Sequence, residues 1–398
     1  MNLKNSILLM VLGNSLKNYS NNTAINTVII TSSLALGGAE KALFNLCNTQ
    51  LKHQIYIINL SSEQFFSRKL NEIGIEVYNC KLSNIFNFMK EFIKIIYLIY
   101  KINPKNIQTW MYHADFLSIP LKIFFPFKKF YWGLRNGSMK LNKKTVFIVN
   151  ILSIFSYFVP HKIISCANST TSMHISKGYC KKKMLTINNG IDTNIYFKNT
   201  KLRDDFRKKF FLKDNDLIIC MVARWHPQKD HITVFDSIKR LKKLLNLNFY
   251  LVLAGTGIDK SNNELIFELE KRKIIDNVML MGEVDDIVTI YNAADINILC
   301  STEGEGFPNV LAEAMACGTP CISTNSGDAA KITDKYGWLI NEKNTLDLTN
   351  TILDEVQRSK NKNDVLINSN NSINHIKLNY SYKNMINKYC EAWNINPI

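Results

Sequence analysis

Two α/β domains of the Rossmann type, facing each other across a cleft, are predicted by three observations on the sequence. The chain has 398 residues, which is enough for two domains of ordinary size. In the first half, a run of mostly β-branched residues at Thr27–Ser32 leads through two glycines into an apolar-periodic helix at 41–50. The second half shows an alternation of its own from Leu217–Val222 onward, so each half is expected to form its own domain.

Composition excludes several classes of protein. Hydrophobic residues make up 46% of the chain and charged residues 21%, which is ordinary for a globular protein and unlike a disordered chain or a membrane bundle. The nine cysteines are scattered and none has paired C-x-x-C spacing, so a zinc site is not expected. We interpret them as reduced core residues of a cytosolic protein.

The formal net charge of +16 belongs to one half of the chain. Residues 1–200 sum to +17 and residues 201–398 to −1. A nucleic acid, an anionic membrane surface or an anionic substrate could each explain the excess. A composition bias toward Lys, Asn and Ile is the alternative, but it should act on both halves equally and does not explain the scarcity of acids in one.

Residues 1–24 are expected to lie outside the domains. The apolar run at 6–13 follows Lys4 and is too short to span a bilayer, and no convincing small-residue cleavage site comes after it. We interpret the segment as a loose extension, or as the result of a start codon assigned too early. A secretory signal peptide is the alternative.

The glycine pair Gly37 and Gly38 lies between the first strand and its helix, where glycine lets the backbone approach a ligand at the carboxyl end of a sheet. Further on, the chain interleaves aromatic and aliphatic residues with lysines at 84–100, 120–132 and 146–159. Such runs suit buried helices and strands. Rings beside cations also suit a membrane surface, and both interpretations stay open.

His113 lies in the segment TWMYHAD, residues 109–115, at the end of an expected strand. A lone histidine is more often structural than catalytic. In the second half, the turn after the first strand reads ARWHPQKDH and places Arg224 and Lys229 five residues apart around a proline. Both cations could converge on one anion and stabilise a departing diphosphate in place of a metal, although two solvated cations are the simpler alternative.

The stretch Ser301–Thr324 packs a small-residue turn, two carboxylates and a helix start between two expected strands. Glu305 and Glu313 are separated by seven residues. Pro308 suits the first helical position, and Gly318 is expected to end the helix. Taken alone, the two glutamates could be a solvated loop acid and a surface residue of an amphipathic helix. Beyond this stretch we expect an Asn-rich loop at 361–374 and a last helix at 382–393.

The stretch from Glu305 to Pro320 resembles, without a gap, the signature of retaining family-4 glycosyltransferases of the GT-B fold, which carry E-x7-E and a helix ending in EAMACGTP. GGAE after the first strand, WMYHAD and the phosphate-binding turn ARWHPQKD are similar to the same family. The resemblance covers residues 27–395. It implies an N-terminal extension at 1–24, an acceptor domain at 25–189, a nucleotide-sugar domain at 190–375 and a C-terminal helix at 376–398 that crosses back to the first domain.

The resemblance also implies roles for individual residues. Arg224 and Lys229 would bind the diphosphate of the donor, Glu305 would contact sugar hydroxyls and Glu313 the ribose. His113 would lie at the cleft near the donor sugar and the acceptor. Backbone groups would complete the donor site at Gly37, Gly38, Val284, Phe307 and Asn309. Pro308 cannot donate the N–H that glycine supplies in many relatives, and Lys331 replaces a common acid.

The implied reaction moves a hexose or N-acetylhexosamine from a nucleotide-diphosphate sugar, best a UDP-sugar, to a glycan or polyprenyl-linked glycan in surface polysaccharide biosynthesis. We expect no metal, no other cofactor and no nucleic-acid partner. The enzyme is expected in the cytoplasm, with peripheral docking on the inner face of the cytoplasmic membrane as an open extension. A non-transferring enzyme of the same fold, such as a UDP-N-acetylhexosamine epimerase, and an inactive sugar-nucleotide-binding scaffold are the alternatives.

Overall fold

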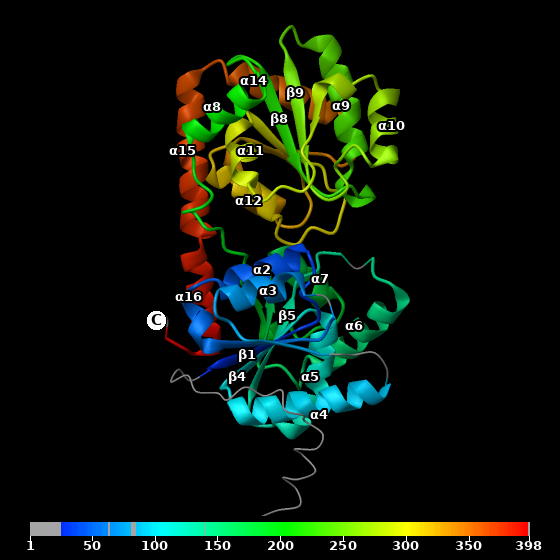
Figure 1. Ribbon diagram of the computed structural model, residues 1–398, viewed down its shortest axis with the longest axis vertical. Coiled ribbons are helices and arrows are strands. Elements are labelled where there is room, and N and C mark those ends of the chain that lie inside the picture. The colour runs from blue at the N-terminus through cyan, green and yellow to red at the C-terminus, as the bar shows by residue number, and fades with distance from the viewer. Residues whose placement is uncertain (1–24, 63, 81–84, 139, 397–398) are drawn as a thin grey trace, which may run out of the picture.

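The computed structural model describes residues 25–62, 64–80, 85–138 and 140–396 (Figure 1). The expectations for residues 1–24 therefore lie outside the described part of the chain. The described residues form two parallel α/β domains stacked end to end, as the sequence predicts. The carboxyl ends of both sheets face the boundary between the domains, which is where ligands bind in open α/β sheets.

The first domain is built on seven parallel strands in the order β3-β2-β1-β4-β5-β6-β7. Every residue of β1, β2 and β4 is buried, because helices cover both faces of the sheet. The strands are β1 Thr27–Thr31, β2 Ile55–Asn59, β3 Val77–Asn79, β4 Asn106–Trp110, β5 Lys129–Leu134, β6 Lys162–Ser165 and β7 Met184–Thr186. The helices are α2 Gly38–Cys47, α3 Phe65–Glu72, α4 Ile85–Ile102, α5 Tyr112–Phe124, α6 Lys143–Phe155 and α7 Asn168–Ser176.

The second domain has six parallel strands in the order β10-β9-β8-β11-β12-β13. The strands are β8 Leu217–Val222, β9 Phe249–Ala254, β10 Val278–Leu280, β11 Ile296–Leu299, β12 Cys321–Thr324 and β13 Trp338–Ile340. The helices are α8 Thr200–Lys209, α9 His231–Leu244, α10 Asn263–Lys271, α11 Ile287–Ala293, α12 Asn309–Ala316, α13 Ala329–Thr333, α14 Thr345–Arg358 and α15 Lys362–Asn379. One more helix, α16 Tyr382–Trp393, follows them and packs on the first domain. Short 3-10 helices lie at Gln50–Gln54, Lys181–Lys183, Pro227–Lys229, Ile275–Asn277 and Asp334–Tyr336.

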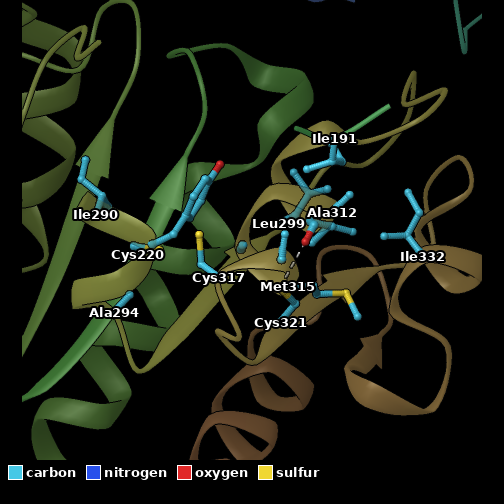
Figure 2. Packing of buried hydrophobic residues seen from close by; sticks show 14 of the residues in the cluster. Ile191, Cys220, Ile290, Ala294, Leu299, Ala312, Met315, Cys317, Cys321 and Ile332 are labelled. Carbon is cyan, nitrogen blue, oxygen red and sulfur yellow. Dashed lines mark hydrogen bonds between the residues drawn. The ribbon is translucent and has the colours of Figure 1, made fainter. Parts of the chain in front are cut away.

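Helix α12, which follows the Glu305 loop, lies at the centre of the second domain's core. Figure 2 shows its side chains Ala312 and Met315 among Cys220, Leu299 and Cys321, which come from the neighbouring strands. The helix begins at Asn309, so Pro308 is its N-cap and not its first residue. Gly318 follows the helix with a φ of +79°, as the expected helix end requires. All nine cysteines are free and buried, in agreement with the core role predicted for them.

The prediction of a loop at 361–374 is wrong, because these residues belong to α15. Asn361 caps the helix by accepting from the backbone N–H groups of Asn363 and Asp364. The helix then packs along α12, where Ile376 is buried and the Ser372 hydroxyl donates to the Met315 carbonyl at 3.3 Å. Tertiary packing thus outweighs the poor helix propensity of asparagine.

The last helix, α16, returns to the first domain and fills its core with Met385, Tyr389 and Trp393. The Trp393 indole N–H donates to Gln108 Oε1 at 3.1 Å, and the Asn106 amide donates to the Trp393 carbonyl at 2.9 Å. The red end of the chain in Figure 1 lies beside the blue first domain for this reason. Across the described residues, no helix is long and apolar enough to cross a bilayer.

Candidate functional site

A cavity of about 1370 Å³ lies between the two domains and is lined by segments from both. The first domain contributes Gly37, Gly38 and Lys41 after β1, and residues between 135 and 140 after β5. The second domain contributes the loops that follow β8, β9, β10 and β11. Each lining loop follows the carboxyl end of a strand, so the arrangement of both sheets directs polar groups into one space.

Lys229 and Glu305 form an ion pair inside this cavity. The side chain of Lys229 is 18% exposed and that of Glu305 12%, so both charges are largely withdrawn from water. The Ser301 hydroxyl also donates to Glu305 Oε1, at 2.6 Å. Desolvation strengthens such charge-assisted contacts, and two donors on one carboxylate oxygen fix its orientation.

The turn that carries Lys229 is tied to the loop that carries Glu305. The Gln228 side-chain amide donates to the Glu303 carbonyl at 2.7 Å, and the Thr302 N–H donates to the Gln228 carbonyl at 2.9 Å. These reciprocal bonds join residues far apart in sequence into one rigid unit. The cation and the carboxylate are therefore held in place before any ligand arrives.

Arg224 is exposed and lines the same cavity, so the structure brings it together with Lys229 as the sequence suggests. Gly255, on the next loop, has a φ of +142°, and a Cβ there would meet the Ala223 carbonyl oxygen at 2.4 Å. Only glycine fits between these two turns. His231 is buried nearby, and this burial, with Lys229 adding in the same direction, lowers its pKa to about 3. It is therefore neutral at pH 7.

Glu313 does not line the cavity. Its carboxylate is buried within α12, where it accepts from Lys41 Nζ at 3.1 Å and from the Tyr291 hydroxyl at 3.1 Å. Lys41, from the first domain, does line the cavity and also reaches the Tyr196 hydroxyl at 3.3 Å. The negative charge of Glu313 raises the pKa of Lys41 above its ordinary value despite burial. This ion pair connects the two domains.

Of the predicted backbone contacts, Gly37, Gly38 and Val284 line the cavity. The other two lie behind it. Phe307 is buried against Tyr380, and the Asn309 side chain accepts from the Asn189 amide at 3.0 Å.

His113 is exposed in the first turn of α5 and is not among the residues that line the cavity. Arg135 lies there instead, with its guanidinium carbon 3.6 Å from the centre of the Trp110 ring. It donates to Asn189 Oδ1 at 3.2 Å and to the Tyr389 hydroxyl. The sequence alone assigns no role to Arg135 or Lys41. The signal for Arg135 is its place directly after the strand that ends at Leu134, in WGLRN, whereas Lys41 lies within α2 and is marked only by the GGAEK segment.

The domains are held together by further contacts around the cavity. Asp328, in the second domain, accepts from the backbone N–H groups of Asn168 and Ser169 at 2.7 and 2.8 Å. These amides start α7 in the first domain, where a carboxylate also interacts favourably with the helix dipole. Lys140 pairs with Glu303 at 2.6 Å across the same boundary. Among the residues that the structure describes, no cluster of His, Cys, Asp and Glu is arranged to hold a metal ion.

Known glycosyltransferases resemble this chain in sequence and in structure. Residues 203–371 match the family of glycosyl transferases group 1. The chain is 29% identical to the N-acetyl-alpha-D-glucosaminyl L-malate synthase of Bacillus anthracis, over 38% of each chain. It is 27% identical to the UDP-Gal:alpha-D-GlcNAc-diphosphoundecaprenol alpha-1,3-galactosyltransferase of Escherichia coli, over 52% of this chain and 53% of that one. The aligned region thus spans about two fifths to half the length of these relatives.

Solved structures cover nearly the whole chain. Anabaena HepE in complex with UDP superposes with a TM-score of 0.82 at 17% identity, covering 93% of this chain and 99% of that one. WaaG, a glycosyltransferase involved in lipopolysaccharide biosynthesis, superposes with a TM-score of 0.65 at 14% identity, covering 92% of this chain and 99% of that one. At this level of identity the likeness shows a shared fold.

Proposed function

Because residues 203–371 match the glycosyl transferases group 1 family and the described residues have the GT-B fold, we propose that the protein is a retaining glycosyltransferase. It transfers a hexose or N-acetylhexosamine from a nucleotide-diphosphate sugar to a glycan or a polyprenyl-linked glycan in surface polysaccharide biosynthesis. The observation that carries the proposal is the interdomain cavity in which the Lys229–Glu305 pair and Arg224 meet.

In the proposed mechanism, cations on the protein stabilise the departing diphosphate. Arg224 and Lys229 face the cavity, so positive charge is in place where negative charge develops as the bond from sugar C1 to the phosphate oxygen breaks. Glu305 accepts hydrogen bonds from sugar hydroxyls. The acceptor oxygen forms its bond to C1 on the face that the phosphate leaves, and its proton passes to the departing phosphate. This step requires no separate base on the protein.

UDP is the donor nucleotide that the comparisons favour. HepE structures hold UDP and UDP-glucose, and the Escherichia coli relative is named for the donor UDP-Gal. Val284 lines the cavity beside Glu283 and Asp285, and we assign its backbone to the base. We also assign Glu313 to the ribose. Because its carboxylate is buried on Lys41 and Tyr291 and does not line the cavity, this contact requires the Lys41–Glu313 pair to open when the donor binds.

Acceptor recognition is assigned to the first domain. His113 follows the carboxyl end of β4, at the same sheet edge as Gly37 and Arg135, so it remains our candidate on the acceptor side. The Escherichia coli relative is named for an acceptor on diphosphoundecaprenol. A lipid-linked acceptor in turn favours a cytoplasmic enzyme that works peripherally at an anionic membrane surface.

We further propose that transfer needs no metal. Two cations converge on the cavity, and the described residues around it include no metal-binding cluster of acids. The exposed, adjacent acids Asp285 and Asp286 are the nearest alternative.

Incubation with a panel of UDP-, GDP- and ADP-sugars and a mixture of lipid-linked and soluble glycan acceptors, read by mass spectrometry, tests the proposed function. Transfer predicts an acceptor heavier by one sugar residue together with free nucleoside diphosphate. An epimerase would convert the donor into its epimer, or release the epimeric sugar, without extending an acceptor, and chromatography before the mass measurement separates the epimers. A binding scaffold would leave every donor unchanged. Lys229→Ala provides the inactive control.

A further inference from the structure

The surface of the first domain carries almost unopposed positive charge over a long segment. Residues 77–191 contain 17 Lys and Arg but only two acids, Glu91 and Asp115. Both acids are buried, at 4% and 0% exposure. Over the described part of this segment, the solvent-facing side chains therefore include lysines and no carboxylate.

Many of these lysines gather at the amino-terminal edge of the sheet, opposite the cavity. Lys105 directly precedes β4, Lys129 begins β5 and Lys162 begins β6. His161 lies among them, and its pKa is lowered by burial and further by Lys129, Lys162 and other nearby lysines. Several lysines therefore lie close enough to His161 to affect it, which agrees with a cluster of positive charge at this edge.

Large apolar side chains are exposed at the same edge. Helices α5 and α6 run from the cavity side of the sheet toward this edge, because each follows one parallel strand and precedes the next. Near their ends Ile123 is 78% exposed, Phe127 97% and Phe158 75%. A hollow of about 530 Å³ opens between Ile154, Tyr157, Phe158 and Gly178. We call the surface formed by Lys105, 122–129, 153–162 and 177–183 the basal face.

Helix α4 extends this surface. It lies beneath the sheet on the side away from the second domain (Figure 1), and it exposes Met89, Ile93 and Tyr100. Soluble proteins rarely leave so many large apolar side chains together in water, so an apolar surface of this extent indicates an interaction site.

We propose that the basal face docks on an anionic lipid bilayer. Exposed rings can insert at the headgroup level while lysines contact anionic headgroups, a combination that favours lipid over nucleic acid or an acidic protein. This inference rests on the proposed function, because the basal face would be the surface through which the enzyme reaches a lipid-linked acceptor.

Helix α6 connects the basal face with the cavity. Lys140, shortly before the helix, lines the cavity, whereas Phe158, just after it, lies on the basal face. Thirteen residues of helix rise by about 20 Å. Phe147, in the second turn, is 65% exposed, so apolar surface continues from the basal face toward the cavity. An acceptor whose tail stays in the bilayer could follow this side of the domain.

Flotation of the full-length protein with vesicles tests the proposal without any substrate. The protein should float with phosphatidylglycerol-containing vesicles at low salt, be released at 0.5 M salt, and bind phosphatidylcholine vesicles much more weakly. Lys129→Gln combined with Lys181→Gln and Lys182→Gln should lower binding by roughly 100-fold, since each cation near the surface contributes about fivefold. Phe127→Ser with Phe158→Ser should also release the protein.

The matched control replaces three exposed lysines of the second domain, Lys208, Lys239 and Lys243, by Gln and should float like the wild type. The inactive Lys229→Ala variant should float as well, which separates failure of docking from failure of the proposed activity. Three results would overturn the inference. The protein could fail to float with anionic vesicles at low salt, or the control variant could lose as much vesicle binding as the basal-face variant. Light scattering could also show a dimer of the wild type that dissociates in Phe127→Ser. Binding of RNA but not of vesicles would do the same.

Discussion

Replacing Lys41 by Met should weaken the coupling between the two domains and lower the free energy of unfolding by about 2 kcal/mol. The substitution keeps most of the apolar stem and removes the ammonium group that lies 3.1 Å from Glu313. Glu313 is 3% exposed and would keep the Tyr291 hydroxyl as its remaining donor. A buried carboxylate that loses its cation is left without compensation for its desolvation.

The magnitude follows from the exposure of the two partners. Removing one member of a fully buried ion pair costs about 3–5 kcal/mol, whereas exposed pairs contribute about 0–1 kcal/mol. The Glu313 side chain is 4% exposed but that of Lys41 is 37% exposed, so water screens the pair from one side. We therefore place the expected loss between these limits, at about 2 kcal/mol.

Urea unfolding followed by circular dichroism measures the loss, with Lys41→Arg as the control that keeps the charge. The two domains can unfold in separate steps. Because Lys41 and Glu313 lie on different domains, the loss of stability should appear in the first step. A double-mutant cycle with Glu313→Gln isolates the pairwise free energy.

The contribution of the Lys41–Glu313 pair to the free energy of unfolding should fall only as pH rises. Because Glu313 raises the pKa of Lys41 above the value in the unfolded chain, the stabilisation is fully present below the ordinary lysine pKa of about 10.4. It is lost only as pH rises through the higher pKa of the folded state. The difference between wild type and Lys41→Met should therefore be the same at pH 7 and pH 9. A difference below 0.5 kcal/mol at pH 7, or a coupling free energy near zero, would refute this account of the pair.

Three further predictions concern the cavity and its closure. Arg224→Ala and Lys229→Ala should each lower turnover by at least about 10²-fold, and near-wild-type turnover in either would remove it from the diphosphate site. Folding should change little for the exposed Arg224, whereas loss of Lys229 leaves the largely buried Glu305 without its cation and should also lower the free energy of unfolding. Activity should survive excess EDTA, because protein cations take the role of a metal; a strict need for magnesium or manganese would show that the site is misassigned. Asp328→Asn should weaken the contact with the start of α7, lower the free energy of unfolding by about 1–3 kcal/mol and increase the radius of gyration in solution scattering. Unchanged values for both quantities would show that Asp328 does not hold the domains together.

Local sequence patterns are sufficient to predict the strands and helices of the second domain that position its part of the site. The strands are short β-branched or apolar runs that end in glycine or charged turns, and Gly318 ends α12 with the backbone conformation that glycine favours. The pairing of Lys229 with Glu305 was harder to predict. Sequence reasoning identified both residues but assigned them to different parts of the donor, and only the fold shows that they contact each other.

Contacts between distant segments explain what sequence reasoning missed. Lys41 contacts Glu313 and Asp328 contacts Ser169, and neither pair has a local pattern that would reveal its partner. The sequence predicts a loop where α15 lies because asparagine is a poor helix former, whereas the burial of this helix against α12 is visible only in the folded chain. Lysine-flanked aromatic runs posed the opposite problem, since the same composition suits a core strand and an exposed face. In the structure Trp132 is buried, whereas Phe127 is 97% exposed.

The anomeric configuration of the product tests the central claim most directly. The enzyme would be incubated with the α-linked nucleotide sugar that it turns over, and the new linkage would be read from the coupling constant of the anomeric proton by NMR. A retaining transfer through the Lys229–Glu305 cavity predicts an α-linked product. A β-linked product, or release of an epimerised free sugar with no linkage formed, would contradict it.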